Sequence, residues 1–280
     1  MKKILLTTAA LGLSIATSTT ANAGVLDGVS VSASVDYVSE YVFRGVSFAN
    51  TAVQPGIEAS VGNFTLGTWA SVAVGESSTL AGDEIDVYGS YGQNITDKLS
   101  GSLGFTIFHF PESNGLFDFD SDDGGSTFEI FGGLAYDTVL APALTGYYDF
   151  TLDAFTLEGS VSHSFPVADK TSFDLGVTGG FVTGDSEYEW ATGSASLGYA
   201  FSDNASAYVG VNFSVNSEDN LDLVDADDIQ DIVDAAIADG SIDADLLDGV
   251  DLIPAVRAFG LAGPTDDTLF WVGTGFSTSF

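Results

Sequence analysis

The chain has 280 residues, of which 40 are acidic and 6 basic, giving a formal net charge of −34, and it has no cysteine. So negative a charge argues against binding nucleic acid or another polyanion. The lack of cysteine excludes disulfides and a cysteine-linked lipid. The mean hydropathy is nevertheless +0.26, with 21 Phe, 10 Tyr and 33 Gly, so the chain is both acidic and apolar.

Residues 1–23 have the pattern of a secretory signal peptide. Lysines at positions 2 and 3 precede an apolar run over 4–16, and Ala-Asn-Ala at 21–23 is a small-residue cleavage site. An uncleaved anchor helix is the alternative, but the run is short and interrupted by threonine and serine. We therefore expect cleavage after residue 23 and a single domain over 24–280.

The next segment, residues 29–43, alternates apolar and polar side chains with the period of a strand. Gly-Asn at 62–63 separates two further alternating segments and predicts a hairpin turn. The same rhythm predicts the remaining strands, so that the full set after 29–43 is 53–61, 64–74, 84–93, 98–110, 128–136, 144–150, 155–165, 172–181, 190–201, 205–215 and 268–280.

An exported chain with alternating strands can cross a membrane only as a closed sheet, because lipid cannot satisfy the backbone at open edges. The sequence therefore predicts an all-β fold, a transmembrane antiparallel β-barrel of about twelve strands in the bacterial outer membrane, with ten or fourteen strands as alternatives. Short turns should face the periplasm. Long external loops are expected at 44–52, 75–83, 111–126, 182–189 and 216–267.

Several stretches in the N-terminal third carry a resemblance to a known family. They are Tyr-Val-Phe-Arg-Gly-Val-Ser at 41–47, Ala-Val-Gln-Pro-Gly at 52–56, Gly-Thr-Trp-Ala-Ser at 67–71 and Glu-Ile-Asp-Val-Tyr at 84–88. In these stretches the chain resembles the TorF-type porins, outer-membrane barrels of Gram-negative bacteria. The resemblance implies a barrel with a pore, and a terminal Phe280 that signals to the barrel-assembly machinery. The insert at 216–267 departs from the family pattern.

Acidic residues recur on the face that we assign to the barrel interior, or lumen. Carboxylates in a narrow channel attract cations, which predicts a cation-preferring pore; the alternative is a hydrated interior without selectivity. Arg44 is the one basic residue expected on this face near a strand end, either in a constriction or in a salt bridge that fixes the barrel. The expected pore-lining residues are Asp36, Glu40, Arg44, Glu58, Asp86, Glu129, Glu158 and Asp174.

Two acidic loops suggest further features. The first loop matches a calcium-binding loop except that Asp123 stands where the turn glycine belongs, and a merely solvated loop is the alternative. Its ligands would be Asp118, Asp120, Asp122 and Glu129. Residues 227–252 have apolar side chains at helical spacing. They predict a partly helical extracellular loop before the last strand, which either plugs the barrel mouth or caps it.

The sequence has no phosphate-binding loop, nucleotide fingerprint or cluster of metal-binding histidines. His109 and His163 are the available histidine bases, so a lipid-acting hydrolase is the less favoured alternative. A non-conducting structural or adhesive barrel is the other. We expect a non-enzymatic, porin-like channel in outer-membrane lipid for passive diffusion of small solutes and ions, with no cofactor unless calcium binds.

Overall fold

The computed structural model describes residues 28–75, 83–113, 115–120, 124–184, 187–217 and 268–280. Its strands are β1 Val29–Val38, β2 Tyr41–Phe43, β3 Val46–Ala49, β4 Ala52–Val61, β5 Phe64–Ala73, β6 Glu84–Asn94, β7 Leu99–His109, β8 Ser126–Tyr136, β9 Ala143–Asp149, β10 Ala154–Ala168, β11 Thr171–Thr183, β12 Tyr188–Ser202, β13 Ala205–Asn216 and β14 Thr268–Ser279. Within these described ranges, no helix is long and apolar enough to cross a membrane.

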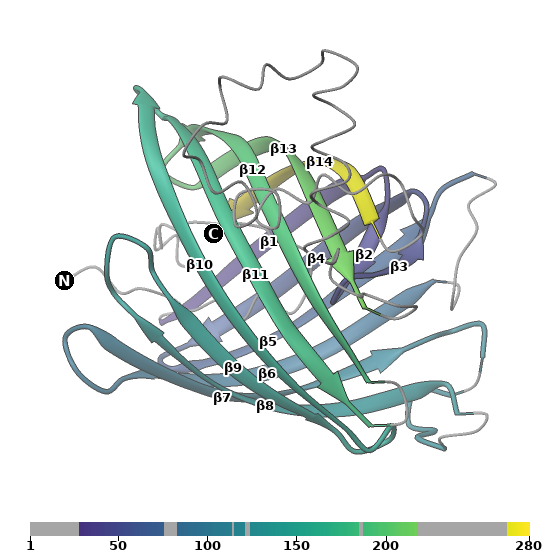
Figure 1. Cartoon of the computed structure of the whole chain (residues 1–280). Helices are drawn as coiled ribbons and strands as arrows, with labels where there is room; N and C mark the ends of the chain where they lie inside the picture. The colour runs from purple at the N-terminus through teal and green to yellow at the C-terminus, as the bar shows by residue number, and fades with distance from the viewer. Residues whose placement is uncertain (1–27, 76–82, 114, 121–123, 185–186, 218–267) are drawn as a thin grey trace, which may run out of the picture.

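Twelve of the described strands close into one antiparallel barrel, in the order β1-β14-β13-β12-β11-β10-β9-β8-β7-β6-β5-β4 (Figure 1). The barrel closes where β1 pairs with β14, from Ser32↔Ser279 to Val38↔Gly273. This closure confirms the predicted twelve-stranded antiparallel barrel. The observed barrel strands end within a few residues of their predicted limits, except for the first.

The two ends of the barrel differ in the length of their connections. At one end, β1 begins, β14 ends, and turns such as that from Val61 to Phe64 are tight. At the other end, the connections over 39–51, 74–83, 110–125 and 217–267 are long. Outer-membrane barrels place short turns in the periplasm and long loops outside. We call the end with the long connections the outer end.

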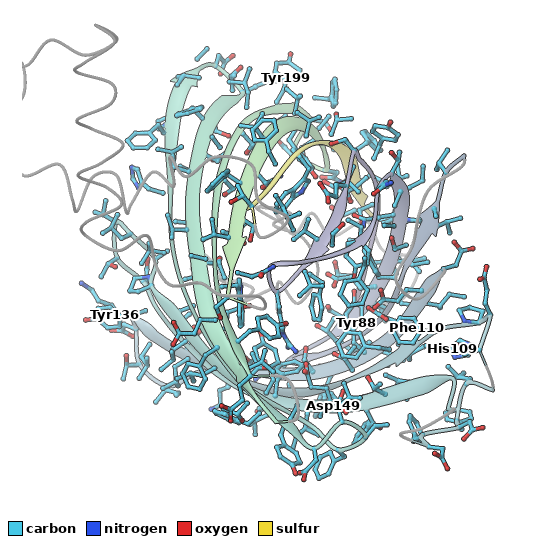
Figure 2. The ribbon with its side chains drawn as sticks, turned by 45° about the vertical axis from the view of Figure 1, so that its right-hand side comes forward. Tyr88, His109, Phe110, Tyr136, Asp149 and Tyr199 are labelled. Atoms are coloured by element: carbon cyan, nitrogen blue, oxygen red, sulfur yellow. The ribbon has the colours of Figure 1, made fainter. Side chains whose placement is uncertain are left out.

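Side chains of the barrel strands alternate between the lipid-facing surface and the lumen. In β6, Asp86 is fully buried at 0% exposure, whereas Ile85 beside it is 40% exposed. Tyr199 of β12 is likewise exposed on the outside, while Tyr88 of β6 lies inside the barrel (Figure 2). The outer surface is rich in exposed Phe, Leu, Val and Ile, as a surface in contact with lipid requires.

The prediction that the first strand runs to residue 43 is wrong, because β1 ends at Val38. Tyr41–Phe43 pairs instead with Val46–Ala49 in a separate two-stranded sheet. Arg44 and Gly45 turn the chain with φ angles of 49° and 82°, the positive values of a two-residue hairpin turn. The apolar–polar alternation continues through this hairpin, so periodicity alone does not reveal the break. We call residues 41–49 the inner hairpin.

Candidate functional site

The inner hairpin lies inside the barrel, near its outer end. The ring of Phe43 packs against Phe108 of β7 with centroids 5.7 Å apart, while Gly45 lies against Trp190 of β12 and Asn216 of β13. Contacts with strands on separate sides of the barrel require a position within the lumen. Figure 2 looks into the barrel and shows the purple N-terminal ribbon entering its interior.

An apolar cluster holds the base of the inner hairpin. Tyr41 is only 3% exposed, and its ring lies 5.5 Å from those of Phe48 and Trp69. The buried members of the cluster are Val38, Tyr41, Val42, Ala49, Ala52, Trp69 and Trp271. Burial of each large apolar side chain contributes about 1.5–3 kcal/mol to the stability of the fold. The cluster therefore packs the hairpin firmly against the part of the wall that runs from β5 to β14.

The tip of the inner hairpin forms a bidentate ion pair with the far wall. Arg44 Nη1 donates to Oε2 of Glu129 at 2.8 Å and Nη2 donates to Oε1 at 3.0 Å. The two side chains are 10% and 2% exposed, and the guanidinium also lies over the ring of Tyr147, 4.4 Å from its centroid. The planar fork of arginine matches a carboxylate in this geometry.

Glu129 belongs to β8, which is well removed around the barrel from β1 and β4, the two strands that carry the hairpin. The ion pair therefore ties the hairpin tip across the lumen. Of the two roles expected for Arg44, the salt bridge is present. Its partner is Glu129. Glu40, which was expected to line the pore, lies in the bend between β1 and β2 and belongs to no barrel strand.

The predicted acidic residues of the barrel strands lie on the inner face, and most have hydrogen-bond partners. The donors are the Tyr208 hydroxyl for Asp36, the Ser32 and Tyr88 hydroxyls for Glu58, the Tyr147 hydroxyl for Glu158, the Ser172 hydroxyl for Asp174 and the Arg44 guanidinium for Glu129. Asp86 is the exception, with both carboxylate oxygens unpartnered among the described residues. Inward carboxylates thus occur on β1, β4, β6, β8, β10 and β11.

Sequence reasoning missed two further buried acidic residues. Glu84 is 3% exposed and shares the inner face of β6 with Asp86. Asp149, at the end of β9, is 6% exposed and accepts hydrogen bonds from the backbone N–H groups of Thr151 and Leu152; it lies at the inner wall in Figure 2. The spacing of Glu84 two residues before Asp86 was the available signal, since alternate strand residues share a face.

The predicted calcium ligands are not gathered in the described part of the chain. Both carboxylate oxygens of Glu129 accept hydrogen bonds from Arg44. Asp118 and Asp120 are described, but Asp122 lies outside the described residues. No group of three or more acidic, histidine or cysteine side chains that could hold a metal occurs among the residues described. The predicted helix over 227–252 and the loop 216–267 around it fall almost entirely outside those residues.

Both histidines have a backbone carbonyl as a partner of Nδ1. His109 Nδ1 lies 2.9 Å from the carbonyl oxygen of Gly125 and 3.0 Å from the hydroxyl of Ser126. A carbonyl only accepts, so Nδ1 carries a proton, and Ser126 donates its own proton to the Leu116 carbonyl. His163 Nδ1 faces another carbonyl, that of Val139, at 2.7 Å. Through these nitrogens neither ring can take a proton from serine.

A closed twelve-stranded barrel with an apolar outside and an acidic inside, narrowed by an inward hairpin, defines the protein as an outer-membrane β-barrel of porin-like architecture. The chain belongs to the family described as "Bacterial protein of unknown function (Gcw_chp)", whose model matches residues 22–212. A comparison with curated proteins found no match.

Solved structures of porins share the fold. The KdgM porin superposes with a TM-score of 0.50 at 12% identity, covering 90% of this chain and 99% of its own. The same porin in complex with disordered oligogalacturonate gives a TM-score of 0.50 at 13% identity, with coverage of 90% and 99%. The NanC porin gives 0.50 at 12% identity, covering 89% and 98%. At these identities the likeness establishes the fold alone.

Proposed function

We propose that the protein is a passive diffusion channel for small solutes and ions, narrowed near its outer end by the inner hairpin. The observation that carries the proposal is the Arg44–Glu129 pair, which holds a loop segment inside a closed, polar lumen. A barrel that served only as a membrane scaffold has no need of a segment anchored across its interior. The porin fold of the solved relatives supports the same function.

The proposed channel prefers cations. Asp36, Glu58 and Asp174 face the lumen, and Arg44 is the one basic side chain among the described residues that does so, since Lys98 and Lys170 lie in turns at the opposite end. The charge of Arg44 is already neutralised by Glu129. A confined excess of carboxylates attracts cations and repels anions. The solute of this channel therefore differs in charge from the oligogalacturonate named with the KdgM porin.

The proposal also covers the subfamily, the export and the assembly of the protein. We assign it to the TorF-type porins on the stretches at 41–47 and 84–88, which form most of the inner hairpin and the acidic start of β6. Residues 1–23 act as a signal peptide, and assembly of the barrel into the membrane uses Phe280. No step of covalent chemistry is assigned to the protein.

Planar-bilayer recording of the purified barrel tests the proposal. We expect discrete conductance steps, and a reversal potential in a potassium chloride gradient whose sign favours potassium. A membrane that contains folded barrel but shows no steps would point instead to a non-conducting structural barrel. Steps with a reversal potential that favours chloride would keep the channel and reject the cation preference.

A further inference from the structure

Glu84 and Asp86, which we call the acidic pair, lie on the inner face of β6 beside the base of the inner hairpin. They are separated by one residue and share a face because successive strand residues point to opposite sides. Their exposed fractions are 3% and 0%. The hydroxyl of Tyr41 lies next to both carboxylates. Two acidic groups and a phenol thus meet in a buried position at the edge of the channel.

Four oxygen atoms of this group have no partner outside it. Within the described ranges, Oε2 of Glu84, both Oδ atoms of Asp86 and the hydroxyl of Tyr41 are buried and accept no hydrogen bond from the rest of the barrel. The other inward carboxylates of the barrel strands differ, because each accepts at least one bond from a side chain or the backbone. The acidic pair is therefore a distinct feature of the lumen and not one more part of a hydrated wall.

A buried carboxylate is costly unless a hydrogen bond, a proton or a cation compensates it. Arg44, the lumen-facing base of the described chain, gives both of its terminal nitrogens to Glu129 and has none left for the pair. The two negative charges of two ionised carboxylates balance the charge of one divalent cation. Their hard oxygen atoms are also the ligands that Mg²⁺ and Ca²⁺ take in proteins.

We propose that the acidic pair and the Tyr41 hydroxyl bind a hydrated divalent cation, Mg²⁺ or Ca²⁺, inside the barrel. Water that enters with the ion fills the remaining coordination positions, as is usual for Mg²⁺ held by one or two carboxylates. With so few protein ligands the site exchanges quickly, and its dissociation constant is on the order of 10⁻⁴–10⁻³ M, the range of extracellular calcium modules. A bound ion beside the inner hairpin would slow monovalent cations that pass it.

Terbium(III) luminescence tests the site in the intact barrel folded in detergent. Tb³⁺ occupies calcium sites and emits when a nearby aromatic ring is excited, and Tyr41 and Trp69 have ring centroids only 5.5 Å apart. We expect saturable emission that Ca²⁺ displaces at millimolar concentration. The isosteric double variant Glu84→Gln/Asp86→Asn should lose at least four-fifths of it, and the single variant Asp86→Asn should lose most of it.

Asp174→Asn is the matched control, because Asp174 is another inward carboxylate, buried to 6% exposure, but already hydrogen-bonded to Ser172. It should keep the emission of the wild type. Emission that Ca²⁺ does not displace, or that is equal in the double variant and the wild type, would overturn the site. Retained near-ultraviolet circular dichroism shows that each variant is folded.

The inference rests on the proposed channel for its effect on current, but its binding test is independent. A wild-type barrel that conducts and shows no displaceable emission keeps the channel and rejects the cation site. A barrel that binds terbium through the acidic pair and does not conduct keeps the site and rejects the channel. When both hold, millimolar Ca²⁺ should reduce the potassium current of the wild type more than that of Glu84→Gln/Asp86→Asn.

Discussion

Arg44 and Glu129 are 85 residues apart in the sequence and meet inside the barrel through two hydrogen bonds of 2.8 and 3.0 Å. Arg44 occupies the tip of the inner hairpin, and Glu129 points inward from β8. The pair thus connects a segment from the first external connection to a distant part of the wall. We expect stability and conduction both to depend on this connection, and each can be measured separately.

Removing the arginine should destabilise the barrel. Arg44→Ala leaves Glu129 as a buried, uncompensated charge, which costs about 3–5 kcal/mol of unfolding free energy when one partner of a buried pair is lost. The double variant Arg44→Met/Glu129→Leu removes both charges and should lose less than the single variant. Urea unfolding in lipid, followed by tryptophan fluorescence, gives the comparison.

Lys98→Ala is the control for these variants, because Lys98 is exposed in a periplasmic turn and surface changes of this kind stay within about 0.5 kcal/mol. Equal stabilities of Arg44→Ala and the wild type would mean that the pair does not hold the hairpin. Arg44→Lys should fall between them, since a lysine cannot form the two parallel bonds.

Gly45 should tolerate a side chain less well than Gly62. Both have positive φ angles, 82° and 61°, so alanine at either position costs about 1–2 kcal/mol of backbone strain. At Gly45 a Cβ would also lie 2.6 Å from Cβ of Trp190, whereas at Gly62 it would meet nothing within 4 Å. Gly45→Ala should therefore lose at least twice as much unfolding free energy as Gly62→Ala. Equal losses would contradict the close packing of the hairpin tip against Trp190.

Neutralising inward carboxylates should weaken the preference for cations. Asp36→Asn/Glu58→Gln/Asp174→Asn keeps the acceptors for neighbouring hydroxyls and removes three charges. We expect the reversal potential in a potassium chloride gradient to move toward zero, most clearly below about 0.1 M salt, where screening extends over about 10 Å or more. The control Asp97→Asn/Asp137→Asn changes exposed turn residues and should leave the potential unchanged. Identical potentials for all three proteins would reject lumen selectivity.

Much of the barrel follows from residue patterns alone. In β4 and β5, which flank a two-residue turn between Val61 and Phe64, side-chain exposure largely alternates as the period of two predicts. The same rule puts Asp86 and Glu129 inside the barrel, as observed. Strand parity is local, because it depends only on the alternation of adjacent residues, and it is therefore readable without knowledge of the fold.

The inner hairpin could not be predicted in this way. Tyr41 and Phe43 continue the alternation of β1, so the pattern is the same whether the strand extends outward or the chain folds back. The positive φ angle of Arg44 is unusual for a residue with a side chain. The pairing with Glu129 depends on barrel closure, which brings β8 within reach of the hairpin, and no spacing along the sequence encodes it.

The last residue should matter for insertion into the membrane. The backbone N–H of Phe280 donates to the Val31 carbonyl at 2.8 Å, and its carbonyl accepts from Val31 N–H at 3.3 Å. These bonds extend the β1–β14 pairing that closes the barrel. Deletion of Phe280 should lower the amount of folded protein in the outer membrane several-fold, while channels that do insert keep their conductance. Unchanged membrane levels would reject a role for Phe280 in assembly.

Single-channel conductance of the wild type and of a variant with a shortened inner hairpin tests the central claim most directly. In the variant, residues 42–48 are replaced by a short Gly-Ser turn, which removes Arg44 and the segment that crosses the lumen. A channel narrowed by this segment should show discrete steps in the wild type and steps at least twice as large in the variant. No steps in either protein, or steps of equal size, would contradict the account.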